Sequence, residues 1–323
     1  MLSRPEFEKK QLVFAFLNDG DKLSFKNDNL IVRSAGGEIR HQSTCYRVLA
    51  VFAVGNASIT TGLIERAHRF GFPIFLMKEN LRVYDVLGHV TEGNTKLRRR
   101  QYLSDGEGIA QRLVANKIGN QRAALMRQRN KTRETKEAIQ VLAALEETAL
   151  RMEGNVHELM GLEGSAAKTY FPQQFNNADW TSRRPRVKGD FLNAVLDLGY
   201  TILFHYMEAL LKLFGFDLYV GVLHREFYMR KSLVCDFVEP FRPLIDLAVR
   251  KAVSLGQCRQ EDFSVRNGRW ELNKEERKRY VGFLVRPILE NRTAMFCYVQ
   301  DYYRAFVREA DAAEYPWFGM EGA

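Results

Sequence analysis

The sequence predicts an α+β protein, in which a small β-rich N-terminal domain precedes a larger all-helical C-terminal domain. Short runs rich in β-branched and aromatic residues, separated by turn residues, are concentrated in the first part of the chain, up to about residue 90. From residue 109 onward, apolar residues recur at helical spacing. With 323 residues, 46% of them hydrophobic, the chain is long enough for two ordinary domains.

The N-terminal domain is predicted from its turn residues and apolar runs. The segment 27–29 and the pair Gly36-Gly37 are turn signals between β-favouring runs. A continuous apolar run over residues 46–54 is typical of a strand buried on both faces. Residues 60–70 have helical spacing, and Gly71 suits the end of that helix. The predicted strands cover residues 11–17, 29–34, 46–54, 73–77 and 82–90.

The C-terminal domain is predicted to be helical because strand signals give way to helical periodicity. Pro240 suits the first turn of its helix, where the missing N–H has no partner to lose. Residues 88–94 are typical of a linker, so we divide the chain into domains of residues 1–92 and 93–323. The predicted helices cover residues 109–126, 134–152, 155–171, 191–214, 240–254, 274–289 and 293–308.

The net charge of +9 is concentrated in one part of the chain. Residues 96–136 hold twelve Lys and Arg against three acids. Such a cluster favours a polyanionic partner, since contacts with phosphate groups dominate the affinity of nucleic-acid complexes. The alternative is an ordinary solvated helical surface, and charge by itself does not choose between the two.

The remaining composition indicates a cytoplasmic protein. The four cysteines are scattered, without a Cys-x-x-Cys pair, which fits a reducing compartment and gives no zinc signal. No uninterrupted apolar run approaches 18 residues, so no membrane span is expected. The charged N-terminus lacks the apolar segment of a signal peptide.

Three ionisable residues in the helical half stand beside apolar residues rather than in solvated charge runs: Glu163, His224 and Glu239. Burying such groups costs free energy unless they are paired, and a divalent metal ion is one possible partner. Asp236, three residues before Glu239, lies where both carboxylates can point the same way. Each position also has an ordinary explanation, as a surface glutamate, a core histidine or a helix cap.

Oxygen ligands with one nitrogen suit Mg²⁺ or Mn²⁺. A divalent ion beside a phosphodiester can polarise the phosphoryl oxygen and stabilise the leaving oxygen. Together with the basic stretch, these residue types therefore point to cleavage or transfer of DNA strands.

At these residues the chain resembles the CRISPR-associated adaptation integrase, a metal-dependent nuclease-integrase that inserts new spacers into CRISPR arrays. Residues 159–171 are similar to the first ligand motif of that family, and residues 219–224 match its histidine motif. Similar sequence continues at Arg230, residues 232–233, Asp236, Glu239 and residues 241–243, and is also found at residues 55–59, 71–75, 183–185 and 191–200. Two departures are Leu81 and Met229, which stand where the family often has glycine.

The resemblance implies that Glu163, His224 and Glu239 are metal ligands and catalytic residues, with Asp236 as a further catalytic candidate. It implies Mg²⁺ or Mn²⁺ as cofactor, a dimerising N-terminal domain and a catalytic C-terminal domain. The implied partners are double-stranded DNA (prespacer and CRISPR repeat), a second copy of the chain, and the small ferredoxin-like adaptation protein of the CRISPR system. The expected role is adaptation in antiviral defence.

The primary hypothesis for function is integration by transesterification, in which the 3′-OH of a short DNA attacks the repeat strand. No nucleotide-binding Gly-x-x-x-x-Gly-Lys-Ser/Thr loop is present, and none is needed, because bond energy is conserved. His224 is assigned as a ligand, with a role as general base left open. Alternatives are a structure-specific nuclease for branched DNA and a non-catalytic DNA-binding scaffold.

Two further segments are singled out. The C-terminal run of residues 315–319 is aromatic and either docks a partner or packs on its own domain. The candidate contacts with DNA phosphates are basic residues in two clusters, with a solvated linker as the alternative for the first cluster: Lys96, Arg98, Arg99 and Arg100, then Arg183, Arg184, Arg186 and Lys188.

Overall fold

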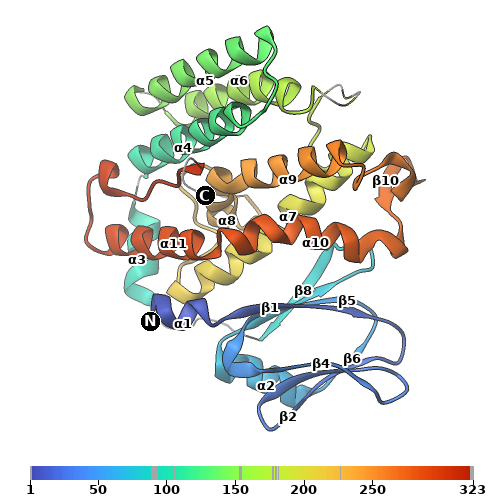
Figure 1. The fold of residues 1–323 in the computed structure, drawn as a ribbon. Helices are drawn as coiled ribbons and strands as arrows, with labels where there is room; N and C mark the ends of the chain where they lie inside the picture. The colour runs from blue at the N-terminus through green and yellow to red at the C-terminus, as the bar shows by residue number, and fades with distance from the viewer. Residues whose placement is uncertain are drawn as a thin grey trace. The chain divides into compact units, whose positions relative to one another are not determined.

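The computed structural model describes residues 2–88, 94–104, 106–152, 155–176, 178, 180, 182–225 and 227–320. By its contacts the chain divides into two compact units. The first comprises Met1–Asn94 and Glu208–Gly215, and the second comprises Thr95–Met207 and Phe216–Ala323. A strand-rich N-terminal part followed by a helical part confirms the predicted fold class (Figure 1).

In the described residues the first unit contains two four-stranded sheets, two helices of its own and the C-terminal end of α7 (Phe191–Phe214). One sheet has the order β1-β5-β7-β8, with β1, β5 and β7 parallel and β8 antiparallel to β7. The other has the order β4-β3-β2-β6. The elements are α1 (Arg4–Glu8), β1 (Gln11–Leu17), β2 (Lys22–Lys26), β3 (Asn29–Arg33), β4 (Ile39–Thr44), β5 (Val48–Gly55), β6 (Ser58–Ile59), α2 (Thr61–Phe70), β7 (Pro73–Met77) and β8 (Val83–Gly88).

The core of the first unit confirms most of the predicted elements. β5 is buried along nearly its whole length, as its continuous apolar run predicts, although it begins at Val48 because Cys45–Arg47 form a 3₁₀ turn. Gly71 ends α2 in the left-handed conformation, at φ 69°. The predictions lack α1, β2, β4 and β6. Of these, β4 is mostly exposed and has no apolar alternation. The predicted linker and the end of the last predicted strand fall on residues 89–93, which lie outside the described residues.

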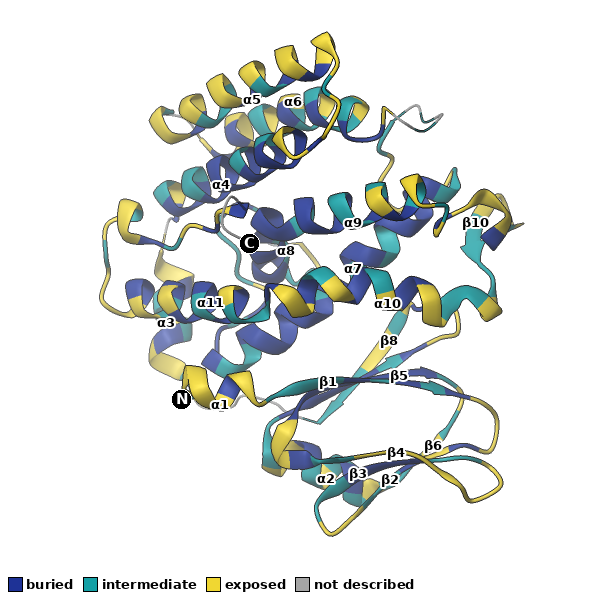
Figure 2. Ribbon diagram, in the orientation of Figure 1, coloured by how far each residue is buried: buried dark blue, intermediate teal, exposed yellow. Residues whose placement is uncertain are grey.

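The second unit is dominated by helices. Helices α4, α5 and α6 pack on one another, and α4 also contacts helix α9 and the 3₁₀ turn η2. Figure 2 shows that α4 is largely buried, whereas one side of α5 is exposed. The helices are α3 (Thr95–Leu103), α4 (Glu107–Met126), α5 (Arg133–Arg151), α6 (Val156–Gln174), α7 (Phe191–Phe214), α8 (Ser232–Val238), α9 (Arg242–Ser254), α10 (Arg277–Glu290) and α11 (Arg292–Val307), with 3₁₀ turns η2 (Glu239–Phe241), η3 (Gln260–Asp262), η4 (Lys274–Glu276) and η5 (Ala312–Glu314).

The helical part is not free of strands, in contrast to the prediction of an all-helical domain. β9 (Phe263–Arg266) and β10 (Arg269–Leu272) form an antiparallel hairpin. Its two-residue turn is Asn267-Gly268, with φ values of 50° and 73°. Asn-Gly favours this turn because both residues tolerate positive φ. Helices α3 and α8 were also not predicted, since both are short and lack a clear apolar stripe.

Helix α7 is long and apolar enough to cross a membrane by length and composition alone. However, 72% of its most apolar window is buried inside the protein. Gly199 on this helix meets Ile245 so closely that an added Cβ would lie 2.4 Å from the Ile245 Cγ2 atom. We therefore assign α7 as a core helix.

Leu81 and Met229, which stand where the family often has glycine, both adopt the left-handed backbone conformation that glycine favours. Leu81 has φ 63° and Met229 has φ 57°. Side chains with a Cβ rarely occupy this region, and doing so costs about 1 kcal/mol or more. The turn geometry at both positions is therefore retained despite an unfavourable residue.

Candidate catalytic centre

Glu163 lies in the middle of α6, next to unfilled space. Asn155 caps the helix, its side chain accepting hydrogen bonds from the backbone N–H groups of His157 (2.9 Å) and Glu158 (3.3 Å). A Cβ added at Gly161 or Gly164 would meet nothing within 4 Å. Both glycines therefore border open space, and the Glu163 side chain itself is 23% exposed.

His224 is held by the carboxylate of Asp236. The Asp236 Oδ2 atom accepts hydrogen bonds from the backbone N–H groups of Val222 (2.6 Å) and Leu223 (3.2 Å). Its Oδ1 atom accepts one from the His224 backbone (2.9 Å) and lies 2.7 Å from Nδ1 of the His224 ring. A ring that donates from Nδ1 keeps Nε2 as a bare nitrogen, available to a metal ion.

The close approach of Asp236 explains Gly221 in the histidine motif. A Cβ at Gly221 would lie 2.7 Å from the Asp236 Oδ2 atom and 2.7 Å from the His224 carbonyl oxygen. Glycine is therefore required for the loop to wrap around the carboxylate. Asp236, which is fully buried, binds this loop, whereas Glu239 pairs with Lys117 and Arg242.

Glu239 lies at the joint between α8 and α9, in the short 3₁₀ turn that Pro240 opens. Its side chain is only 4% exposed, yet two cations neutralise it. Arg242 donates from Nε to the Glu239 Oε1 atom at 3.0 Å, and the Lys117 Nζ atom lies 2.5 Å from the Oε2 atom. Burial raises the pKa of Glu239, but Arg242, Lys117 and His224 lower it to about 2. The carboxylate is therefore ionised at neutral pH.

Lys117 links Glu239 to Glu163. It extends from α4, its side chain is 9% exposed, and it also donates a hydrogen bond to the Glu163 Oε1 atom. Burial lowers the pKa of this ammonium, but the two glutamates more than compensate and raise it. One cation thus bridges two of the three predicted ligands.

Lys117 was not predicted as a site residue. It entered the sequence analysis only as part of the basic stretch of residues 96–136. Its surroundings carried the missed signal, because it follows the apolar run Leu113-Val114-Ala115 and precedes Ile118. A lysine inside an apolar helical segment needs a buried anionic partner.

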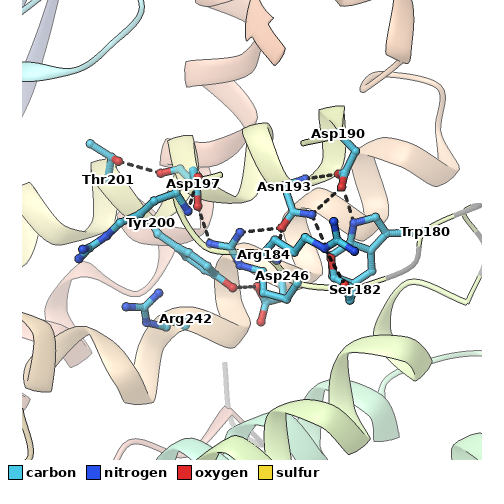
Figure 3. A network of polar contacts seen from close by, with 12 residues as sticks. Trp180, Ser182, Arg184, Asp190, Asn193, Asp197, Tyr200, Thr201, Arg242 and Asp246 are labelled. Carbon is cyan, nitrogen blue, oxygen red and sulfur yellow. Dashed lines mark hydrogen bonds and ion pairs between the residues drawn. The ribbon is translucent and has the colours of Figure 1, made fainter. Parts of the chain in front are cut away.

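A second cluster of polar residues surrounds Asp246 and includes Arg242, which also binds Glu239 (Figure 3). The Arg242 guanidinium lies 4.6 Å from the centre of the Tyr200 ring. Tyr200 and Tyr170 both donate their hydroxyl groups to Asp246, the latter at 3.1 Å. Burial raises the pKa of Asp246 to about 6 even though the two hydroxyls lower it. Arg242 therefore connects the proposed ligand Glu239 to a buried carboxyl that is only weakly acidic.

The second predicted DNA-contact cluster divides into one internal and several external residues. Arg183 donates to Asn193 at 2.8 Å, pairs with Asp197 at 2.5 Å and is only 9% exposed. Its guanidinium holds the loop on the first turns of α7, where further hydrogen bonds join Trp180, Ser182, Arg184, Asp190 and Asn193 (Figure 3). Arg184 and Arg186 are exposed, and Lys188 is half-buried.

The first predicted cluster is divided in the same way. Lys96 and Arg99 are exposed on α3, whereas Arg98 and Arg100 are half-buried. Arg100 donates to the carbonyls of Phe306 and Val307 at the end of α11 and lies 3.0 Å from Glu309. That position suits a cation, since the last carbonyls of a helix have no helical partners.

The aromatic C-terminal run packs on the second unit rather than projecting from it. Tyr315 and Phe318 are buried. Asn116 donates to the Phe318 carbonyl at 2.7 Å and accepts from its N–H at 2.9 Å. Asn120 donates both to that carbonyl, at 2.8 Å, and to the Pro240 carbonyl, at 2.9 Å. The tail is thereby tied to α4 and to the turn that carries Glu239.

The donor set fits a divalent cation. Among the described residues, no three His, Cys, Asp or Glu side chains already stand at metal-holding distance from one another. Instead, the Lys117 ammonium stands between the two glutamates. The Glu239 Oε2 atom is buried and lies 2.5 Å from the Lys117 Nζ atom. Two carboxylates that already share one cation offer the oxygen ligands that Mg²⁺ and Mn²⁺ prefer.

A sequence profile of the family described as CRISPR associated protein Cas1 matches residues 15–284. The chain belongs to this family. A CRISPR-associated endonuclease Cas1 from Thermus thermophilus is 32% identical over 260 residues, which cover 76% of this chain and 75% of that one. The family and the enzyme class predicted from the sequence, a CRISPR-associated endonuclease and integrase, are thus confirmed.

Further relatives and solved Cas1 structures agree with this assignment. A fusion of exonuclease Cas4 with endonuclease Cas1 from Geobacter sulfurreducens is 30% identical over 311 residues, covering 88% of this chain and 53% of the fusion. A Cas1 protein from Thermotoga maritima has a TM-score of 0.78 at 18% identity, covering 92% of this chain and 97% of that chain. A casposase bound to an integration product has a TM-score of 0.75 at 16% identity, covering 96% and 95%. These two likenesses establish the Cas1 fold.

Proposed function

We propose that this Cas1 chain inserts short DNA fragments into a CRISPR array, using a Mg²⁺ or Mn²⁺ ion held by Glu163, His224 and Glu239. The observation that carries the proposal is the bridge of one internal cation between Glu163 and Glu239, beside an imidazole whose Nδ1 is anchored. When bound, the ion supplies Lewis-acid polarisation of the phosphoryl group and stabilises the leaving oxygen. Relatives described as Cas1 endonucleases, and a structural neighbour bound to an integration product, support the same reaction class.

The reaction exchanges one phosphodiester bond for another. The 3′ oxygen of the incoming DNA forms a bond to phosphorus in the repeat strand, and the bond from that phosphorus to its own 3′ oxygen breaks. The attacking hydroxyl loses a proton and the leaving oxygen gains one. Because bond number is conserved, no nucleotide cofactor is needed.

The residues of the chain prepare this centre in three ways. Asp236 fixes the rotamer and tautomer of His224, since it takes the hydrogen bond from Nδ1. Arg242 holds the Glu239 carboxylate in one orientation through a 3.0 Å hydrogen bond. Lys117 holds the Glu163 carboxylate next to Glu239, since its ammonium contacts both. In this assignment Asp236 is a positioning residue rather than a ligand.

A strand-transfer assay tests the proposal. A short duplex with free 3′-OH ends is incubated with Mn²⁺ and a supercoiled plasmid carrying the repeat, and joined products are counted. We expect Glu163→Gln, His224→Asn and Glu239→Gln each to reduce joining by at least about 100-fold, a loss typical of removing charged transition-state groups. The matched control is Glu158→Gln, an exposed carboxylate on the same helix as Glu163. Wild-type joining by all three site variants refutes the ligand assignment.

The same assay separates the alternative functions. A structure-specific nuclease hydrolyses a branched substrate much faster than it joins ends. A scaffold without catalytic activity binds DNA and gives no product with any divalent ion. The ionised Glu239 and the anchored His224 favour an enzyme over a scaffold, because burying them brings no benefit to simple DNA binding.

DNA binding is assigned to the exposed members of the two basic clusters. Lys96, Arg99, Arg184 and Arg186 are candidates for phosphate contacts, whereas Arg183 and Arg100 are engaged within the fold. The double change Arg184→Ala and Arg186→Ala is expected to reduce the slope of log affinity against log salt by roughly 2. The control is Arg308→Ala, an exposed arginine paired with Glu314. An unchanged slope removes this loop from the DNA contact surface.

The partners follow from the family. Structural neighbours include a Cas6-RT-Cas1–Cas2 complex and a Cas1 bound to DNA. We infer that this chain acts as a homodimer through its first unit and works with the small ferredoxin-like adaptation protein on double-stranded DNA. We also infer a cytoplasmic location, with which its four free cysteines agree. Size-exclusion chromatography with light scattering tests the dimer.

A further inference from the structure

We infer that Lys117 is an internal counter-cation that occupies the place of the metal ion in the metal-free protein and gives it up when the ion binds. The inference rests on the proposed function, since it concerns the same carboxylates. Lys117 then acts as a positioning residue, because it holds Glu163 and Glu239 together through contacts that the divalent ion would take over.

The geometry of the ammonium carries the inference. The Lys117 Nζ atom bridges the Oε1 atom of Glu163 and the Oε2 atom of Glu239, with the second contact at 2.5 Å. Mg²⁺ binds carboxylate oxygens at about 2.1 Å, and larger ions at about 2.5 Å. An ion that uses these two oxygens therefore needs nearly the volume that Nζ now fills. The ammonium and the ion cannot both occupy it.

The negative charges of Glu163 and Glu239 require a cation beside them. Glu239 is 4% exposed, and Glu163, at 23%, is partly screened. Two neighbouring carboxylates without a counter-ion repel each other and lose hydration. Arg242 neutralises the Oε1 side of Glu239. Among the described residues, the cation that pairs with both glutamates is Lys117, so the bridge between them depends on it.

The two oxygens of the Glu239 carboxylate have different cations beside them. The Oε2 atom lies 2.5 Å from the Lys117 Nζ atom. The Oε1 atom accepts a hydrogen bond from Arg242 at 3.0 Å. Arg242 therefore keeps the carboxylate in place while Lys117 leaves. The long, flexible lysine stem allows this movement without a shift of α4.

The position of α4 is fixed by contacts that do not involve the carboxylates. Asn116 and Asn120 on this helix hold the C-terminal run at Phe318, and Asn120 also binds the Pro240 carbonyl. The base of the Lys117 side chain is therefore anchored to the same turn that carries Glu239. Exchange of the ammonium for a metal ion therefore requires only the Lys117 side chain to move.

Two measurements without DNA test the inference: thermal unfolding with EDTA or with Mn²⁺, and the Mn²⁺ dissociation constant from calorimetry. In Lys117→Met the carboxylates lose their internal cation. We expect the melting temperature in EDTA to fall by roughly 5 °C, and Mn²⁺ to restore most of this loss. We also expect Mn²⁺ to bind roughly tenfold more tightly than to wild type, because no ammonium has to be displaced.

Arg122→Met is the matched control. Arg122 lies on the same helix and pairs with Glu146 at 3.0 Å, away from the predicted ligands. Its loss is expected to lower the melting temperature in EDTA without any extra recovery in Mn²⁺. Mn²⁺ binding that is unchanged or weaker in Lys117→Met overturns the inference, because Lys117 then either does not compete with the ion or supports it.

A double variant covers the case in which Lys117→Met does not fold. In Lys117→Met with Glu163→Gln, one positive and one negative charge are removed together. This protein is expected to melt higher in EDTA than Lys117→Met and to lose the Mn²⁺ response. A double variant that is no more stable than the single one overturns the inference.

The outcome is separable from the proposed function. If wild type shows no Mn²⁺ binding that depends on Glu163, the metal site itself is refuted. If wild type and Glu163→Gln differ as expected but Lys117→Met binds Mn²⁺ like wild type, only the role of Lys117 is refuted.

Discussion

Two buried carboxyl groups, Glu239 in η2 and Asp246 in α9, have pKa values that are shifted in opposite directions. Glu239 has Arg242 and Lys117 as neighbours, and these cations lower its pKa to about 2 despite burial. Asp246 has the hydroxyls of Tyr170 and Tyr200, and burial raises its pKa to about 6. Burial is almost complete for both, so the difference comes from the neighbours. Glu239 pairs directly with two cations, whereas Asp246 accepts hydrogen bonds from neutral hydroxyls and the nearby arginines lower its pKa less.

The comparison explains which carboxylate suits a metal ion. A metal ligand has to be ionised, and Glu239 is ionised under all ordinary conditions. Asp246 is partly protonated near pH 6, which suits a group that supports other residues through hydrogen bonds. Arg242 belongs to both clusters, because it binds Glu239 and stacks on Tyr200.

The largest expected effect concerns the pH dependence of stability at Asp246. Its pKa is about 6 in the folded protein against 3.8 normally, so the folded state binds more protons between these values. The contribution of Asp246 to stability therefore falls as the pH rises from about 4 to 6, by about 3 kcal/mol in total. Asp246→Asn should remove this fall, as measured by urea unfolding across that range.

The control for this experiment is Asp301→Asn, an exposed aspartate paired with Arg304 at 3.2 Å. It should leave the pH profile unchanged. If Asp246→Asn retains the wild-type fall between pH 4 and 6, Asp246 is ionised throughout, and the contrast with Glu239 is wrong.

A smaller effect is expected when the shared arginine is removed. Arg242→Met takes one cation from Glu239 and the stacking partner from Tyr200, and should lower the free energy of unfolding by about 2 kcal/mol. Adding Glu239→Gln should recover part of this loss, since no uncompensated charge then remains. Urea unfolding in EDTA measures both, and a double variant that loses the sum of two independent effects contradicts the coupling.

A still smaller loss of stability is expected for Tyr170→Phe. This change removes one hydroxyl donor to Asp246 and should cost about 1 kcal/mol. Because that hydroxyl lowers the pKa of Asp246, its loss should also move the fall in stability to higher pH. A pH profile that moves to lower pH is inconsistent with Tyr170 as a donor to the carboxylate.

The smallest effect is expected at an exposed ion pair. Arg286 and Glu290 lie 2.8 Å apart on α10, with most of both side chains in solvent. Arg286→Met should change the free energy of unfolding by less than about 0.5 kcal/mol. A loss comparable to that of Arg242→Met means that burial does not explain the difference between the two arginines.

Much of the fold could be predicted from local pattern. The 24 residues of α7 were predicted with the observed bounds, because the helix is strongly apolar and mostly buried. The hairpin of β9 and β10 was missed although Asn267-Gly268 is a strong local turn signal. The exposed strand β4 carries no apolar alternation, so its pairing with β3 depends on the neighbouring strand rather than on its own sequence.

The residues of the candidate site also divide into those that the local sequence predicts and those that it does not. Its acidic residues and histidine were found by sequence because their flanking residues are specific, down to Gly221, which the loop around Asp236 requires. Their partners were not found. Arg183 was expected to meet DNA but is paired with Asp197, and Lys117 was counted as surface charge but is buried. Whether an arginine or a lysine faces solvent depends on which acid the fold brings to it.

The sequence by itself determined the family, the order of the domains and the identity of Glu163, His224 and Glu239 as candidates, because motifs are local and survive without coordinates. Only the tertiary structure decided their neighbours. Lys117 on α4 and Arg242 on α9 meet Glu239 because separate helices pack together, and these contacts set the charge of the site. The physical reason is that electrostatic energy depends on distance in space, and separation along the chain does not give that distance.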